Sequence, residues 1–182
     1  MLMSVAQGWL DHGQPDKAKK LAQEIVDSKP GEELLASAQS LLKKINRVGQ
    51  PLAIKFKAID GREVDLAALK GKVVLIDFWA TWCGPCMAEL PKVKAAYAKL
   101  KPKGFEIIGI SLDREKEALD SVLAREEMTW PQYLDNGEGT KFAEEFEIES
   151  IPTMWLVDKK GNLRELNARE GMAEKVEKLL AE

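Results

Sequence analysis

The spacing of apolar residues changes near residue 50. Over residues 1–48 the apolar positions recur every three or four residues, as along one face of a helix, for example at Leu34, Leu41 and Ile45. Beyond a Gly-Gln-Pro break the pattern turns to alternation and short apolar runs, which are typical of strands. The pattern therefore predicts a helical extension over 1–48 and a second domain over 51–182.

The second domain is predicted to alternate strands with helices. A near-continuous apolar run over 72–79 is typical of a central strand covered on both faces. The expected strands are 53–59, 62–66, 72–79, 105–112, 153–158 and 163–166, and the expected helices are 85–100, 114–128, 141–146 and 172–180. Pro91 lies inside the first of these helices and is expected to kink it. This order predicts an α/β fold with a mixed central sheet flanked by helices.

The helical extension carries a weak likeness to a repeat. Residues 13–18, with Pro30 twelve residues further on, resemble the second half of a tetratricopeptide unit. Such repeats need about three copies to be stable alone, so a helical hairpin packed on the main domain is an equal alternative. If the repeat interpretation holds, we expect further helical repeats to precede Met1.

Charge and composition narrow the class of protein. The 182 residues include 27 Lys and Arg against 30 Asp and Glu, and a net charge of −3 argues against a nucleic-acid partner, which calls for a basic surface. No apolar run reaches the roughly 18 residues of a membrane-spanning helix. Residues 1–10 lack the charged and apolar regions of a secretory signal. We therefore expect a soluble globular chain, which a longer precursor could still contain.

The two cysteines, Cys83 and Cys86, stand three positions apart. A disulfide between them would close almost no loop and would add little loop-closure entropy to stability, so the pair favours a chemical role over a structural one. Zinc is the alternative, but a structural zinc site needs four ligands, and the single histidine is the distant His12. The pair is therefore interpreted as a redox centre without a metal.

The position of the pair suits thiol–disulfide exchange. Cys83 is expected at the N-terminus of a helix, directly after a buried strand, where unpaired backbone N–H groups lower the pKa of a thiol. Pro85 suits the first turn of that helix because it has no N–H to leave unpaired. Cys86, one turn further and expected to be the more buried, would resolve the mixed disulfide that Cys83 forms with a substrate.

These residues end a longer run, Val73-Val74-Leu75-Ile76-Asp77-Phe78-Trp79-Ala80-Thr81-Trp82-Cys83-Gly84-Pro85-Cys86, that resembles the active-site strand and helix of thioredoxins. Residues 86–91, residues 107–113 and the sequence Ile151-Pro152-Thr153 resemble the extracytoplasmic TlpA/ResA-like (AhpC/TSA-related) branch. The resemblance covers roughly residues 51–182. It implies a thioredoxin fold, a thiol–disulfide oxidoreductase with no cofactor beyond its redox-active disulfide, a location outside the cytoplasm, and electrons supplied by a membrane partner.

The resemblance also implies roles for single residues. Asp77 matches a buried aspartate that exchanges a proton with the resolving cysteine, and burial should raise its pKa; the alternative is a capping role at a strand end. Pro152 matches a cis-proline that faces the cysteines, with an ordinary trans-proline as the alternative. Glu89 matches a Glu-x-Pro pattern of the branch, although a solvated carboxylate explains it equally well. Contacts to the substrate are expected from Trp82, Gly84, Pro85, Ile151 and Pro152.

Two other functions stay open. A thiol peroxidase shares the fold, but it carries a threonine three residues before its reactive cysteine, where this chain has Ala80. A redox adaptor would use the helical extension to bind a protein partner. Gly84 and Pro85 between the cysteines, together with Asp77 and Ile151, resemble reducing relatives. The expected reaction is therefore the reduction of disulfides in protein substrates.

Overall fold

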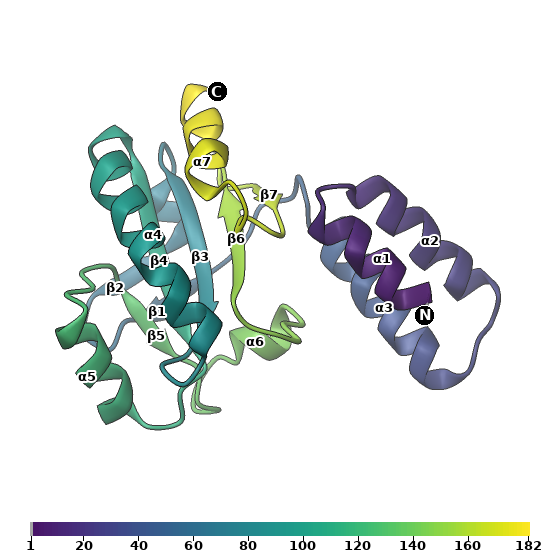
Figure 1. The fold of residues 1–182 in the computed structure, drawn as a ribbon, viewed down its shortest axis with the longest axis horizontal. Coiled ribbons are helices and arrows are strands. Elements are labelled where there is room, and N and C mark those ends of the chain that lie inside the picture. Colours follow the sequence, from purple (N-terminus) through teal and green to yellow (C-terminus); the bar gives the residue numbers. More distant parts are fainter. Residues whose placement is uncertain (1) are drawn as a thin grey trace. The chain divides into compact units, whose positions relative to one another are not determined.

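The computed structural model describes residues 2–182, and the chain divides between Gln50 and Pro51 into two compact units. Within the described part of the first unit, the helices are α1 (Leu2–Asp11), α2 (Pro15–Asp27) and α3 (Glu32–Asn46) (Figure 1). The helical hairpin expected from the sequence would contain two helices, whereas this unit contains three in its described part. The additional break arises because Gly13 takes a φ of +68° and Pro15 begins a new helix.

The second unit is built on a mixed sheet. Its strands are β3 (Val73–Trp79), β4 (Phe105–Ser111), β5 (Gln132–Leu134), β6 (Thr153–Val157) and β7 (Leu163–Glu165). Their order across the sheet is β5-β4-β3-β6-β7. Strand β4 runs parallel to β3 and to β5, whereas β6 runs antiparallel to β3 and to β7. The predicted mixed sheet is thus confirmed.

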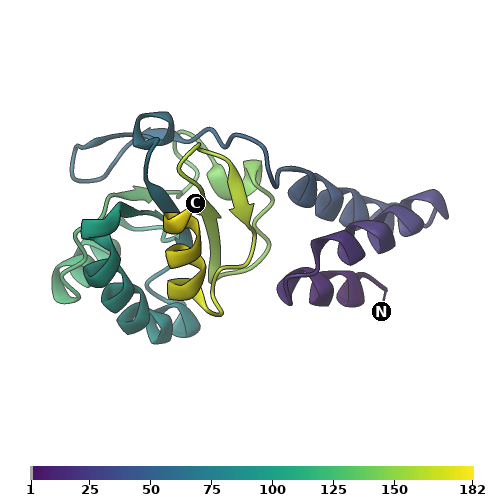
Figure 2. The ribbon, with the colours of Figure 1, turned by 90° about the horizontal axis from the view of Figure 1, so that it is seen from above.

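The other elements of this unit surround the sheet. They are the hairpin strands β1 (Lys55–Lys57) and β2 (Glu63–Asp65), the helices α4 (Gly84–Leu100), α5 (Lys116–Arg125), α6 (Phe142–Glu145) and α7 (Met172–Ala181), and the short 3₁₀ turns Leu66–Leu69 and Lys101–Lys103. Helices α4 and α7 lie side by side (Figures 1 and 2). Helix α4 continues through Pro91 to Leu100. Among residues 2–182, no helix combines the length and apolar character that crossing a bilayer requires.

Strand β3 is buried along its whole length and divides its side chains between two core layers. Leu75 and Trp79 pack in the layer that holds α4, α5 and α7. Ile76 and Phe78 pack in the layer that holds the β1–β2 hairpin and α6. Because side chains alternate along a strand, Asp77 projects on the same side as Leu75 and Trp79, toward the layer that contains α4.

In the second unit, several elements differ from the sequence-based expectation; β1, for example, spans only Lys55–Lys57 of the expected 53–59. Strand β5 is not among the predicted strands, because it has only three residues, directly follows Pro131, and is defined by its pairing with β4. Helix α5 ends at Arg125, short of the predicted 128, because the chain leaves the helix and takes a φ of +53° at Glu127.

Candidate active site

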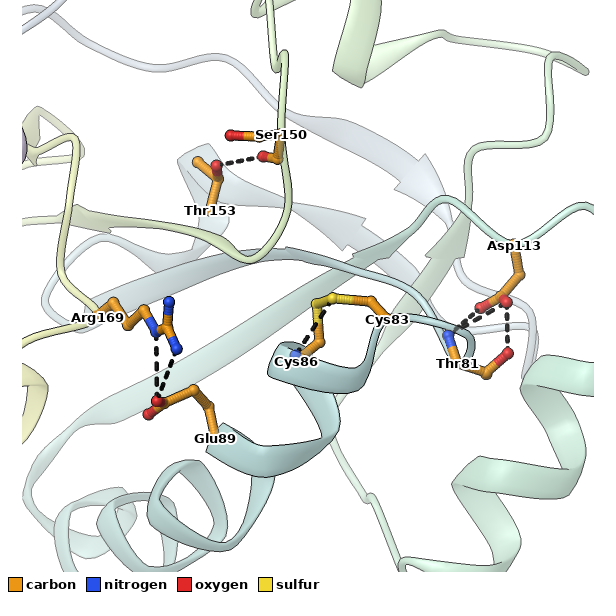
Figure 3. Close-up of a disulfide and its surroundings, with 8 residues drawn as sticks. All are labelled: Thr81, Cys83, Cys86, Glu89, Asp113, Ser150, Thr153 and Arg169. Atoms are coloured by element: carbon orange, nitrogen blue, oxygen red, sulfur yellow. Dashed lines mark hydrogen bonds and ion pairs between the residues drawn. A yellow bond between two sulfur atoms is a disulfide. The ribbon is translucent and has the colours of Figure 1, made fainter. Parts of the chain in front are cut away.

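The disulfide between Cys83 and Cys86 stands at the start of α4 (Figure 3). Cys83 is the N-cap residue of the helix, and its Sγ accepts a hydrogen bond from the backbone N–H of Cys86 at 3.2 Å. Pro85 occupies the first turn, where its missing N–H leaves nothing unpaired. The sulfur of Cys83 is therefore placed where the N-terminal N–H groups of a helix stabilise a thiolate.

Both cysteines are nearly closed off from solvent. Cys83 is 5% exposed and Cys86 is 6% exposed, so the expectation that Cys86 is the more buried is wrong for this disulfide form. The bond holds the two sulfurs together, and the two side chains therefore share one environment. Gly84 and Pro85 between them are exposed and form the outer edge of the pair.

A carboxylate holds the loop that leads into the disulfide. Asp113, 2% exposed, accepts hydrogen bonds from the backbone N–H of Thr81 at 3.0 Å and from its hydroxyl at 2.6 Å (Figure 3). The Ser111 hydroxyl donates to the same carboxylate at 2.6 Å. Sequence reasoning assigned Asp113 no role. The signal that could have found it is a lone carboxylate directly after a buried apolar strand.

Asp77 lies in the middle of β3 and is 6% exposed. It pairs with Gly109 on β4 and with Met154 on β6, so it is not at a strand end. Its Oδ1 has no hydrogen-bond partner among the described residues. Burial raises the pKa of Asp77 from 3.8 to about 7. Near neutral pH this carboxyl can therefore both accept and release a proton.

Trp79 forms part of the core beneath the site. It is 3% exposed, and its indole Nε1 donates a hydrogen bond to Oε1 of Gln132 at 3.0 Å. Gln132, the first residue of the unpredicted strand β5, is 1% exposed. Trp82, by contrast, is 67% exposed and directly precedes Cys83, so it presents an apolar surface to solvent beside the disulfide.

The loop before β6 lies beside the disulfide. The Ile151–Pro152 peptide bond is cis. The Thr153 hydroxyl donates to the backbone carbonyl of Ser150 at 2.7 Å and so closes the loop around this dipeptide (Figure 3). The side chain of Ile151 packs against the core layer that contains Cys83 and Cys86. Residues separated by about 65 positions in the sequence are thus brought together.

Glu89 lies one turn beyond Cys86 and is held by two cations. Arg169, from the segment before α7, donates to its Oε1 from Nε and Nη2, both at 3.2 Å (Figure 3). Lys92 donates to Oε2 at 3.2 Å. Burial raises the pKa of Glu89, but the hydrogen bonds from Lys92 and Arg169 outweigh burial and hold that pKa below its usual value. These residues border a surface cleft of about 590 Å³ that also reaches Met154. Glu89 is therefore a paired anion at the rim of the site.

No cluster of three or more His, Cys, Asp or Glu side chains in the described chain has the arrangement of a metal site. The site comprises a disulfide at a helix N-terminus, a buried carboxyl in the strand that leads to it, and a cis-proline loop beside it. This combination supports exchange of electrons with a second disulfide and movement of one proton.

Comparison with known proteins agrees with this chemistry. The family model described as Redoxin matches residues 47–180, so α1–α3 lie outside the match. The thiol-disulfide oxidoreductase ResA of Bacillus cereus is 34% identical over 119 residues, which cover 65% of this chain and 68% of that protein.

Solved structures give the same assignment. The thioredoxin domain of a thiol-disulfide oxidoreductase from Bacteroides vulgatus is 30% identical, with a TM-score of 0.63 over 73% of this chain and 97% of that one. A thiol:disulfide interchange protein from Bacteroides sp. is 31% identical, with a TM-score of 0.62 over 72% of this chain and 88% of that one. The chain therefore belongs to the Redoxin family, as a TlpA/ResA-like thiol–disulfide oxidoreductase that works through a Cys-x-x-Cys pair.

Proposed function

We propose that this oxidoreductase reduces disulfides in protein substrates outside the cytoplasm. The observation that carries the proposal is Asp77, a buried carboxyl on the α4 side of β3 whose pKa is raised to about 7. A group of this kind can take up a thiol proton near neutral pH and later return it. The Gly84-Pro85 dipeptide between the cysteines, which resembles that of reducing relatives, supports the direction.

In the reductive direction the dithiol form reacts in two steps. The Cys83 thiolate attacks one sulfur of the substrate disulfide, a mixed disulfide forms, and the other substrate sulfur leaves as a thiolate. Cys86 then attacks Sγ of Cys83, which releases the second substrate sulfur and forms the Cys83–Cys86 disulfide. As Cys86 attacks, its proton passes to the carboxylate of Asp77. Two electrons have moved from the protein to the substrate.

The substrate is proposed to bind across the exposed edge of the site. The backbone N–H and C=O of Ile151, next to the cis-proline Pro152, are the groups with which a substrate strand is proposed to pair. Trp82 adds exposed apolar surface, and Gly84 and Pro85 leave the approach to the sulfurs free of bulky side chains. Backbone pairing of this kind suits substrates of many sequences, which is appropriate for a protein-disulfide reductase.

Two partner proteins complete the proposed function. The oxidised pair has to be reduced again, and a membrane dithiol donor is the class of partner proposed. No further cofactor is required, because the two sulfurs carry both electrons. The three helices α1–α3 stand outside the family match and are proposed to bind a protein partner.

Trapping of the mixed disulfide tests this function. In Cys86→Ser the resolving thiol is missing, so the complex between Cys83 and a disulfide-containing protein should accumulate and be visible on a non-reducing gel. In Cys83→Ser, the matched control, no complex should form, because Cys83 is the residue at the helix N-terminus, where a thiolate is stabilised. Equal trapping by both variants, or by neither, would contradict the assigned order. A peroxidase would instead be oxidised by peroxide without any mixed disulfide.

A further inference from the structure

Asp77 and Gln132 each carry a buried polar atom without a partner. Oδ1 of Asp77 is an acceptor, Nε2 of Gln132 is a donor, and neither has a hydrogen bond within the described chain. Gln132 is 1% exposed, so water does not reach its amide freely. Most buried donors and acceptors in proteins are paired, and an unpaired donor near an unpaired acceptor requires an explanation.

The two residues share one row of the sheet. Asp77 pairs with Gly109 on β4, and Gly109 pairs with Gln132 on β5. Paired residues of adjacent parallel strands project to the same face, so the side chains of Asp77 and Gln132 lie on either side of Gly109 on the face that packs against α4. Strands β3 and β5 lie two strand spacings, about 10 Å, apart, and the carboxamide of Gln132 spans part of this distance because it extends over Gly109.

Gly109 makes room for the amide. A Cβ at this position would lie 2.0 Å from Oε1 of Gln132, 2.5 Å from its Cδ and 2.6 Å from its Nε2. Real side chains cannot approach so closely, so the carboxamide of Gln132 occupies the space that any other residue at 109 would fill. The amide therefore lies over β4, in the space next to Asp77.

Trp79 determines which end of the amide is free. Its indole N–H can only donate, and it donates to Oε1 of Gln132 at 3.0 Å. The oxygen of the amide is thus committed to Trp79, which lies two residues beyond Asp77 on the same face of β3. The Nε2 group is left as the donor available to a neighbouring acceptor.

The other groups around Asp77 supply no competing charge. Helix α4 presents Cys83, Cys86 and Tyr97 as its titratable groups in this core layer. The phenol of Tyr97 donates to Glu106, and β6 presents Met154. Glu89, also on α4, is engaged by Arg169 and Lys92 at the rim. Helices α5 and α7 contribute apolar side chains to the layer. Burial is accordingly the one cause that shifts the pKa of Asp77.

We propose that Gln132 is a positioning residue for Asp77: its Nε2, oriented by the indole of Trp79, donates a hydrogen bond to the Asp77 carboxylate when that group is ionised, directly or across one water. The proposal rests on the proposed function, in which Asp77 is the acceptor of the Cys86 proton. The amide stabilises the form of Asp77 that accepts the proton, and so keeps the carboxyl ionisable inside an apolar core.

Two variants and one control test this role. Gln132→Glu retains an acceptor for Trp79 but replaces the amide donor, and Gln132→Met removes both groups at nearly the same volume. Tyr133→Phe, at the next position on β5, loses a hydroxyl that bonds to backbone carbonyls at Glu138 and Thr140, away from Asp77. The pKa of Asp77 is read from its carboxyl carbon by NMR in the oxidised protein, where the disulfide-bonded cysteines do not titrate.

We expect the pKa of Asp77 to rise by about one unit in both Gln132 variants and to stay unchanged in Tyr133→Phe. In the unaltered protein, the side-chain N–H resonances of Gln132 should shift with the same midpoint as Asp77, which needs no variant to fold. An unchanged pKa of Asp77 in both Gln132 variants, or flat Gln132 resonances through the titration of Asp77, would overturn the proposal.

Kinetics separate this proposal from the proposed function. If both hold, the pH profile of mixed-disulfide resolution moves upward in Gln132→Glu by the same amount as the pKa of Asp77. If Asp77→Asn resolves the mixed disulfide as fast as the unaltered protein while the NMR shifts appear as expected, the hydrogen bond stands and the proton-accepting role of Asp77 fails.

Discussion

Asp113 joins the ends of two neighbouring strands by accepting hydrogen bonds from both the backbone N–H and the hydroxyl of Thr81, at 3.0 and 2.6 Å. Thr81 follows β3 and Asp113 follows β4, so the contact fixes the loop that ends at Cys83. The helix N-terminus that stabilises the Cys83 thiolate is therefore held from outside the Cys-x-x-Cys sequence.

Replacing this carboxylate should destabilise the fold. Asp113→Ala leaves the hydroxyls of Thr81 and Ser111 and the Thr81 N–H without their acceptor, which should lower the free energy of unfolding by about 3 kcal/mol. Denaturant unfolding measures this change. Asp120→Ala, which breaks an exposed ion pair with Lys116 on α5, is the control and should change stability by less than about 0.5 kcal/mol. Equal effects would contradict the assigned contact.

Asp77→Asn should stabilise the protein in a pH-dependent way. Because the pKa of Asp77 is raised from 3.8 to about 7 in the fold, the native state holds a proton that the unfolded state has lost over this range, and stability falls as pH rises. At about 1.4 kcal/mol per pKa unit, the full cost is on the order of 4 kcal/mol. The gain from Asn should be absent near pH 4, grow up to pH 7 and level off above it.

Thermal unfolding of the oxidised proteins at several pH values follows this gain. Asp120→Asn, the same substitution at a half-exposed position on α5, is the matched control. A constant difference between Asp77→Asn and the unaltered protein from pH 4 to 9 would mean that the pKa of Asp77 is not raised by folding.

Trp82→Ala should weaken substrate binding without affecting the fold. Trp82 is 67% exposed, so its loss should change the free energy of unfolding by less than about 0.5 kcal/mol. As an exposed aromatic side chain beside the reactive sulfur, it should raise the KM for a protein disulfide about tenfold. Lys160→Ala, at an exposed position in the turn between β6 and β7, should change neither quantity. Steady-state kinetics measure the KM, and a melting curve measures the stability. An unchanged KM in Trp82→Ala would mean that Trp82 does not contact the substrate.

Arg169→Met should raise the pKa of Glu89. The guanidinium and Lys92 hold that pKa down against burial, so loss of the guanidinium leaves burial opposed by Lys92 alone, and the pKa should rise. NMR titration of the Glu89 carboxyl measures it. Lys94→Met, on the same helix but paired with Glu126, should leave the Glu89 titration unchanged.

The sequence predicted those helices and strands whose own residues carry a clear hydrophobic pattern or motif. The apolar run over 72–79 marked β3, and the cysteine pair after it marked the start of α4. Strand β5 was not predicted, because its three residues after Pro131 carry no pattern that distinguishes a strand. The pairing with β4 is what makes this segment a strand. The split of the N-terminal region into three helices depends on the backbone at Gly13, which a period of 3.6 residues does not reveal.

The residues of the site likewise fall into two groups, those that a short sequence signal identifies and those that strand pairing brings together. The cysteines and the Ile151-Pro152 dipeptide carry short, specific sequence signals. The contact between Thr81 and Asp113 depends on where two strands end next to each other, and that follows from the strand order. The register that aligns Asp77 with Gly109 and Gln132 likewise arises from pairing among three strands, which no local pattern encodes.

The equilibrium reduction potential of the Cys83–Cys86 pair is the most direct test of the central claim, that this oxidoreductase is a reductant. It can be measured in dithiothreitol and glutathione buffers by following the fluorescence of the nearby Trp79 and Trp82. The account predicts a value of about −270 to −220 mV, in the range of thioredoxin and glutaredoxins. A value near about −120 mV, as in a strong oxidant, would reverse the direction of the reaction and contradict the account.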